Sequence, residues 1–455
     1  MELEKIGYPE LSTPIPARAP NSAVPLIAVQ RRLWDMLKGH GWPLCLRVCV
    51  SADRILGTLN VEALQRSIEA LIHRHEALRT RIIPINGVPW QHIEPPAEYR
   101  LNTIDLSSQT EPKGECLVKN LVQEFLNEKV DISTGSPFEA RLWKLSDQEH
   151  VLVLQMDHLV SDGVSNSILA RETWALYDQA AGGQAFSLPP LPIQFADYTV
   201  WLHETYDAWM QKHASYWREH LKGFRPIVIP SDAGLTMERS APGLIARIPF
   251  GGALSSRLRD TAQRERTPLP MLVLTAYAIV MSRWCDREDL LINFVSHGRQ
   301  GRPELENVIG YISHELHLRI AMDRALTLHD LLVELQGEFS RATEHQGFNR
   351  VPDFVPECES ELIFHWQSGR QARNARHPHR ARSGQVRLQP FAGLDIDFRR
   401  NFISYFYDTP WGIGMTVNYH PACLAESTIQ RFGEHMRRLA TALVDRPYER
   451  VGASI

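Results

Sequence analysis

The segment from Val151 to Ser165, VLVLQMDHLVSDGVS, places the strongest constraint on how this chain can fold. It opens with six mostly aliphatic residues, which have the length and composition of a strand buried on both faces. The reactive side chains that follow are Asp157, His158, Ser161, Asp162 and Ser165. From Val164 the pattern predicts a helix. Polar groups just beyond a buried strand often form binding or catalytic sites, so we expect a functional site at this strand end.

Asp162 and His158 also have structural interpretations, which the local pattern leaves open. Asp162 precedes Gly163 at the expected helix start, where a short carboxylate accepts hydrogen bonds from the first free backbone amides. His158 is flanked by apolar residues, and such a histidine more often packs in a core than takes part in catalysis.

Composition narrows the class of protein. The formal net charge is −4, so the chain has no basic field that would suit nucleic acid. Its six cysteines form no CxxC pair, which favours reduced cytoplasmic thiols over a disulfide framework or a zinc site. The N-terminal residues lack the apolar core of a signal peptide, and no run is long enough to cross a bilayer. A chain of 455 residues is long enough for two lobes or domains.

Alternating element types predict the fold class. Residues 44–50 are mostly apolar, as in a strand, and the next segment, 61–75, has apolar residues at helical spacing after Asn60, a good cap. Residues 180–194 are rich in glycine and proline and suit a crossover between lobes. Strands alternating with helices favour an α/β architecture.

The string DHLVSDG at 157–163 resembles the HHxxxDG motif of the condensation domains of nonribosomal peptide synthetases. Asp157 takes the place of the first His, and His158 that of the second. Further family motifs have counterparts in the family's order: VQRRLWDML at 29–37, RHEALRT at 74–80, FADYTVW at 195–201 and IGYISHELHLR at 309–319. FVSHGR at 294–299 stands where the family carries a Gly-Arg pair, and HQGFNRVPDF at 345–354 is a looser match.

The resemblance implies an α/β fold of two chloramphenicol acetyltransferase-like lobes that form a V-shaped pseudo-dimer. We expect the N-terminal lobe at 1–181 and the C-terminal lobe at 182–455, with DHLVSDG at the cleft between them.

The resemblance also implies roles for the motif residues. His158 is the expected catalytic group, either as general base or as stabiliser of a tetrahedral intermediate. Gly163 is expected to let the substrate approach a backbone amide that faces the oxyanion. Asp162 is expected to point away from the cleft and to pair with Arg299, and Asp157 is expected to be structural.

Ser165, His314 and Trp411 are the candidates for lining the substrate channel. Ser165 completes the pattern DxxxxDxxS at 157–165, which resembles the signature of heterocyclisation domains, although the retained His158 favours ordinary condensation. His314 stands where the family's fifth motif usually has Asn, so it either adds an imidazole to the acceptor channel or packs there.

The expected function is that of a free-standing condensation enzyme. It would transfer an acyl group from the phosphopantetheine arm of an acyl or peptidyl carrier protein to a small-molecule amine or alcohol. The amide or ester would serve nonribosomal peptide or hybrid polyketide biosynthesis, with chain release as one such step. The arm belongs to the carrier protein, so we expect no bound cofactor and no metal. Neither nucleic acid nor a membrane is an expected partner.

Two other functions stay open. A coenzyme A dependent acyltransferase of the same superfamily is suggested by HxxxDG at 158–163 and by DTPWG at 408–412. A catalytically silent carrier-recruitment domain is disfavoured by the retained His158 and Asp162. The basic run at 371–382 is either a solvated loop or a landing patch for an acidic carrier protein.

Overall fold

The structure is a computed structural model that describes residues 14–20, 22–39, 46–109, 113–232, 243–346, 360–367, 386–391 and 401–453. The basic run at 371–382 and most of the segment at 345–354 lie outside these residues.

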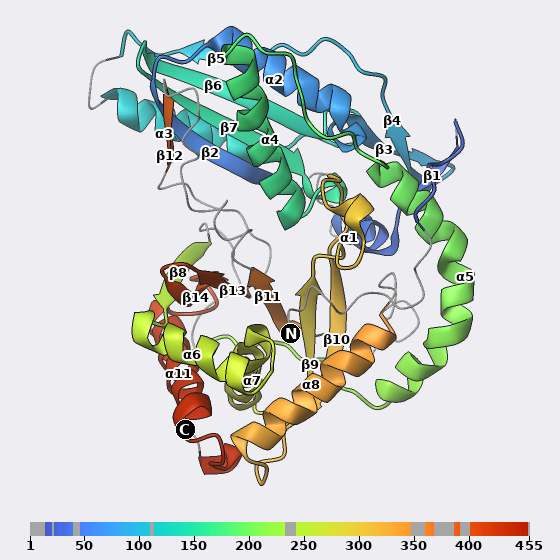
Figure 1. The fold of residues 1–455 in the computed structure, drawn as a ribbon, viewed down its shortest axis with the longest axis vertical. Helices are drawn as coiled ribbons and strands as arrows, with labels where there is room; N and C mark the ends of the chain where they lie inside the picture. The colour runs from blue at the N-terminus through green and yellow to red at the C-terminus, as the bar shows by residue number, and fades with distance from the viewer. Residues whose placement is uncertain are drawn as a thin grey trace.

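The first lobe is built on a five-stranded sheet in the order β12-β2-β7-β6-β5, and a smaller sheet has the order β1-β4-β3 (Figure 1). The strands are β1 Val24–Pro25, β2 Arg47–Gly57, β3 Thr80–Ile85, β4 Val88–Ile93, β5 Asn102–Asp105, β6 Phe138–Ser146, β7 Glu149–Asp157 and β12 Val386–Pro390. The helices of this lobe are α1 Ala28–Gly39, α2 Val61–Arg74, α3 Lys113–Asn127 and α4 Gly163–Ala181.

Strand β7 is buried on both faces, which confirms the prediction from its apolar run. Leu152 and Leu154 belong to a core cluster that also contains residues of α2 and α4. Val151 and Val153 point to the opposite face, where they pack with Val118 and other residues of α3. A strand between two layers of helices needs apolar side chains at successive positions, so its sequence shows no alternation.

The second lobe contains a six-stranded sheet in the order β10-β9-β11-β13-β14-β8. Its strands are β8 Leu244–Pro249, β9 Asp289–Ser296, β10 His314–Ala321, β11 Ile363–Gln367, β13 Phe402–Thr409 and β14 Gly412–Tyr419. Its helices are α6 Gly252–Arg264, α7 Leu269–Trp284, α8 Leu328–Glu344 and α11 Glu426–Asp445. These elements share the largest core cluster of the described residues.

Helix α5, Phe195–His220, and strand β12 both link the two lobes in the described part of the chain. Helix α5 runs along one side of the molecule from the first lobe to the second (Figure 1). Strand β12 pairs antiparallel with β2, from Val386 opposite Gly57 to Pro390 opposite Asp53. The boundary predicted at residue 181 falls at the end of α4, but β12 shows that the first lobe also takes a strand from the C-terminal part of the chain.

None of the helices within the described ranges is long and apolar enough to cross a membrane.

Replacing Leu388 of β12 tests whether this strand stabilises the first lobe. Leu388 is 1% exposed and lies in the core cluster with α2 and α4. Leu388→Ala should lower the free energy of unfolding by about 2–5 kcal/mol, because it leaves a cavity in that core. Chemical denaturation measures the change, with the exposed neighbour Arg387→Ala as the control. Equal effects of the two substitutions would contradict the role of β12.

Candidate functional site

The motif at 157–163 lies between the end of β7 and the start of α4. After Asp157 the chain makes one turn of 3-10 helix, His158–Val160, and α4 begins at Gly163. The buried Asp157 carboxylate accepts hydrogen bonds from the backbone amides of Leu159, at 2.9 Å, and Leu46, at 3.1 Å. Burial raises the pKa of Asp157, although the two amides oppose that rise. Asp157 therefore links β7 to the residue that precedes β2.

The orientation of the His158 ring follows from one hydrogen bond. Its Nδ1 lies 2.8 Å from the carbonyl oxygen of Ser161. A carbonyl oxygen can only accept, so Nδ1 carries the proton and the neutral ring has a lone pair on Nε2. The side chain is partly exposed, which leaves the imidazole accessible to other molecules.

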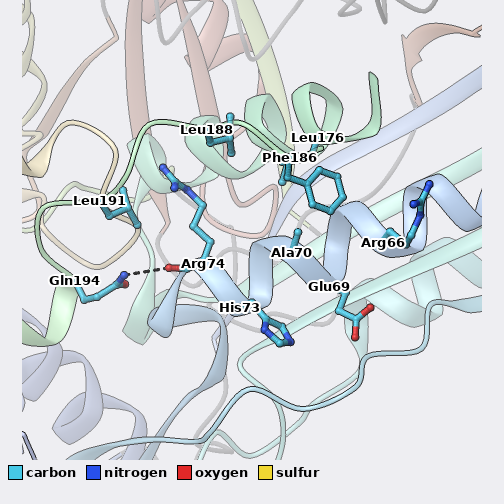
Figure 2. A pocket seen from close by; sticks show the side chains of 10 residues that line it. All are labelled: Arg66, Glu69, Ala70, His73, Arg74, Leu176, Phe186, Leu188, Leu191 and Gln194. Carbon is cyan, nitrogen blue, oxygen red and sulfur yellow. Dashed lines mark hydrogen bonds between the residues drawn. The ribbon is translucent and has the colours of Figure 1, made fainter. Parts of the chain in front are cut away.

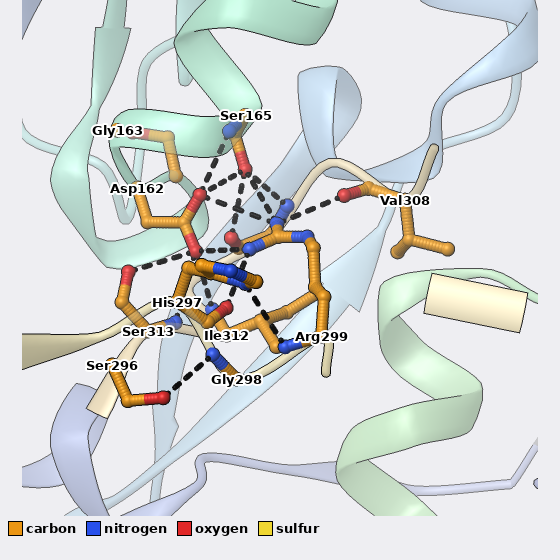
Figure 3. Close-up of polar contacts among 12 residues, drawn as sticks. Asp162, Gly163, Ser165, Ser296, His297, Gly298, Arg299, Val308, Ile312 and Ser313 are labelled. Atoms are coloured by element: carbon orange, nitrogen blue, oxygen red, sulfur yellow. Dashed lines mark hydrogen bonds and ion pairs between the residues drawn. The ribbon is translucent and has the colours of Figure 1, made fainter. Parts of the chain in front are cut away.

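The centre of the site is a buried ion pair between Asp162 and Arg299 (Figure 3). Arg299 Nη1 lies 2.9 Å from one carboxylate oxygen of Asp162, and Nη2 lies 3.2 Å from the other. The arginine also donates to the carbonyl oxygens of His297 and Val308. Arg299 is thus the partner of Asp162 that the family resemblance implied, and the pair joins α4 to the segment that follows β9.

Asp162 accepts several further hydrogen bonds. The backbone amide and the hydroxyl of Ser165 donate to it from the first turn of α4, so the residue is also the N-cap of this helix. The amides of Ile312 and Ser313 donate to it from the second lobe at 3.1 and 2.9 Å. Burial alone would raise the pKa of Asp162, but the Arg299 charge and these donors hold it well below its ordinary range. The carboxylate therefore stays ionised inside the protein.

The structure places the channel candidate Ser165 in the protein interior. Its side chain is fully buried, and its hydroxyl lies 2.7 Å from Asp162 and within hydrogen-bond distance of both the amide and the carbonyl of Gly310. These bonds commit the hydroxyl to the contact between the lobes. The pattern at 157–165 could not show this, because it contains nothing about Gly310.

Gly163 lies at the start of α4 with open space around its Cα. A Cβ built there would meet no heavy atom of the described residues within 4 Å. Its backbone is helical and not left-handed. Neither packing nor backbone conformation therefore requires glycine at this position.

The other channel candidates lie in different environments. His314 begins β10, is buried, and has Nε2 3.3 Å from the side-chain oxygen of Gln346; burial lowers its pKa. His297 is nearby, and burial together with the Arg299 charge lowers the pKa of its imidazole to about 4. Trp411 lies in the turn between β13 and β14 with 62% of its surface exposed. The roles of His314 and Trp411 in a channel stay predictions.

The sequence did not identify the residues of the second lobe that bind Asp162 and Ser165. Gly310, Ile312 and Ser313 bind Ser165 and Asp162 mostly through backbone atoms, which carry no residue-type signal. The only available signal was their position within IGYISH, directly before β10.

A separate groove of about 770 Å³ lies between α2 and the connector that precedes α5 (Figure 2). Its lining residues are Arg66, Glu69, Ala70, His73, Arg74, Leu176, Phe186, Leu188, Leu191 and Gln194. The Gln194 amide donates to the Arg74 carbonyl and closes one end. None of the motif residues at 157–163 lines this groove.

Within the described ranges, no group of three or more His, Cys, Asp or Glu side chains could hold a metal ion.

Comparisons with known proteins identify the family of this chain. The family model for the condensation domain matches residues 21–454. Chondramide synthase cmdD of Chondromyces crocatus is 28% identical over 447 residues, which cover 94% of this chain and 11% of that protein. Phosphinothricin tripeptide synthetase PhsC of Streptomyces viridochromogenes is 29% identical over 446 residues, covering 93% of this chain and 39% of that protein. The chain thus spans less than half the length of these relatives.

Solved structures share the fold at lower identity. The X-domain from teicoplanin biosynthesis aligns with a TM-score of 0.81 and 21% identity over 96% of this chain and 99% of that one. The first condensation domain of the calcium-dependent antibiotic synthetase aligns with a TM-score of 0.74 and 18% identity over 95% of this chain and 99% of that one. These likenesses confirm the expected α/β fold of two chloramphenicol acetyltransferase-like lobes.

Asp162→Asn should destabilise the protein, because it leaves Arg299 buried without its counter-charge. We expect the free energy of unfolding at pH 7 to fall by about 3–5 kcal/mol. The control is Asp147→Asn, which removes an exposed pair with Lys144 and should have little effect, because solvent screens such a pair. Urea denaturation compares the two, and a loss no larger than that of the control would contradict the importance of the buried pair.

The same pair should contribute to the acid sensitivity of the fold. The pKa of Asp162 is lower in the native state than in the unfolded chain, where aspartate titrates near about 3.9. The unfolded chain binds its proton first, so the stabilisation is complete above that value and is lost as the pH falls towards the native pKa. Between pH 7 and about pH 3, the wild type should therefore lose more stability than Asp162→Asn.

Proposed function

Because this chain belongs to the condensation domain family, we propose that it transfers an acyl group from a carrier-protein phosphopantetheine thioester to an amine or a hydroxyl acceptor. The product is an amide or an ester in nonribosomal peptide or hybrid polyketide biosynthesis, including chain release. The expectation of a free-standing enzyme in the cytoplasm forms part of this proposal.

The observation that supports it most is the fixed tautomer of His158. The proton on Nδ1 is donated to the Ser161 carbonyl, so the basic nitrogen of the partly exposed ring is Nε2. A neutral imidazole with a free nitrogen can accept a proton near neutral pH and release it again.

The proposed reaction balances without an added cofactor. The acceptor nitrogen or oxygen attacks the thioester carbonyl carbon, and its proton passes to Nε2 of His158. The tetrahedral oxyanion then collapses, the carbon–sulfur bond breaks, and the imidazolium returns the proton to the departing thiolate. The phosphopantetheine arm enters and leaves as part of the carrier-protein substrate.

Gly163 and the start of α4 are the proposed site for the oxyanion. The first backbone amides of a helix lack intrahelical acceptors and carry the positive end of its dipole, which favours a developing negative charge. The open space beside the Gly163 Cα would let a thioester carbonyl approach this helix end.

A recruitment role is the second candidate, favoured by the likeness to the teicoplanin X-domain. A solved structure contains that X-domain in complex with OxyB. A chain with this role would bind a partner without needing the His158 imidazole.

His158→Ala separates these functions. We expect it to lower the rate of acyl transfer by about 10²- to 10⁴-fold, the usual contribution of general acid–base catalysis. Intact-protein mass spectrometry of an acyl-loaded carrier protein, incubated with amines and alcohols, measures the loss and distinguishes amide from ester. The exposed His203→Ala is the control.

Three outcomes would contradict the proposal. Efficient turnover of free acyl-coenzyme A without a carrier protein would favour the coenzyme A dependent alternative. An unchanged rate for His158→Ala would show that the imidazole is not needed. Binding of the carrier protein without transfer to any acceptor would favour recruitment.

Gly163→Ala tests the proposed oxyanion site. The added methyl meets nothing in the described part of the protein and the backbone is helical, so the unfolding midpoint should not fall. If the substrate occupies that space, kcat should fall by about 10²-fold through misplacement of the thioester. Gly252→Ala is a matched control, because Gly252 also begins a helix, α6, with no neighbour that its Cβ would meet. Equal kcat values for the two variants would contradict the placement.

A further inference from the structure

The segment from Gly310 to Ser313 leads into β10 and is held on both sides of Tyr311. Before Tyr311, the Gly310 amide donates to the Ser165 hydroxyl at 3.0 Å, and the Gly310 carbonyl lies 2.9 Å from the same oxygen. After Tyr311, the amides of Ile312 and Ser313 donate to Asp162. The backbone at Tyr311 therefore has little freedom to move relative to the start of α4.

Phe195 of α5 restricts this segment further. A Cβ at Gly310 would lie 2.2 Å from carbons of the Phe195 ring, so only glycine fits there. The segment thus packs directly against α5 while Ser165 holds it from α4.

This arrangement places the Tyr311 ring against the His158 imidazole. The two ring centroids are 4.7 Å apart and the planes are inclined by 40°. Aromatic rings attract one another at such distances when they are offset or tilted. The imidazole therefore has two described contacts, a hydrogen bond from Nδ1 to Ser161 and the ring of Tyr311.

We propose that Tyr311 is a positioning residue that holds the His158 ring in the orientation needed for proton transfer. The inference rests on the proposed function, since it concerns the same imidazole. The one described hydrogen bond, at Nδ1, restrains rotation of the ring about Cα–Cβ and Cβ–Cγ at a single atom, and the neighbouring tyrosine ring limits that rotation further.

A purely structural role must be distinguished, because Tyr311 also packs against two core clusters of the first lobe and α5. Tyr311→Leu keeps apolar volume but removes the ring, whereas Tyr311→Phe keeps the ring. We expect kcat to fall by about 10- to 10²-fold in Tyr311→Leu, with KM little changed. Tyr311→Phe should retain kcat within about 3-fold, since the ring face remains.

The matched control is another tyrosine beside a histidine. Tyr448 lies 5.6 Å from His329 between ring centroids and is 75% exposed. Tyr448→Leu should leave kcat unchanged.

Ring nitrogen NMR of histidine-labelled protein supplies a readout that needs no substrate. In the wild type, the His158 signals should report one tautomer with the proton on Nδ1. In Tyr311→Leu they should show exchange between tautomers or ring orientations. If neither the wild type nor any variant transferred an acyl group, the proposed function would be overturned. The NMR result would still decide whether Tyr311 positions the His158 ring.

A double-mutant cycle tests the route by which Tyr311 is held. Ser165→Ala removes the anchor of Gly310, so its effect on kcat should be smaller in the Tyr311→Leu background than in the wild type. Additive effects, an unchanged kcat in Tyr311→Leu, or unchanged His158 signals in that variant would each overturn the inference.

Discussion

The buried ion pair of Asp162 and Arg299 is the interaction on which the geometry of the site depends. Its carboxylate caps α4 in the first lobe and accepts backbone amides of the second lobe, and its guanidinium binds two carbonyls near β9 and β10. A buried pair is costly unless its remaining donors and acceptors are satisfied. Here backbone amides and carbonyls and the hydroxyls of Ser165 and Ser313 bind most of them, and Arg299 Nε is the buried donor without a described partner. The pair therefore fixes the distance and angle between two segments that are 137 positions apart in the chain.

Local elements near the motif could be predicted from the sequence because their causes are local. The unbroken apolar run of β7 reflects helices on both faces of the sheet, and Asn60 caps α2 by accepting from the Ala63 amide as its residue type indicates. The Gly-Pro-rich connector, whose residues 182–194 all belong to the described ranges, contains no helix or strand between α4 and α5. In each case, a short stretch of residues contains the whole reason for the structure.

The parts that escaped prediction depend on contacts between distant segments. Strand β12 pairs with β2, although more than three hundred residues separate the two strands in the chain. A pairing over such a distance has no local signal such as the turn of a hairpin. Ser165 looked available for a channel, but Gly310 occupies its hydroxyl. Backbone donors such as the Ile312 amide can come from any residue type, so the sequence does not mark them. The Arg299 pairing was accessible only through the resemblance to a family.

Two carboxylates flank the His158 imidazole in sequence, yet both are committed to other partners. Asp157 is occupied by the Leu46 and Leu159 amides, and Asp162 faces Arg299 and the second lobe. The Nδ1 partner is a carbonyl, which fixes the tautomer without bringing a negative charge to the ring. An ionised carboxylate at that place would favour the imidazolium, because an opposite charge stabilises the protonated ring. In this structure the two described contacts of the imidazole are instead the Ser161 carbonyl at Nδ1 and the Tyr311 ring, and neither carries a formal charge. The motif therefore uses its carboxylates to build the site and keeps them away from the proton transfer.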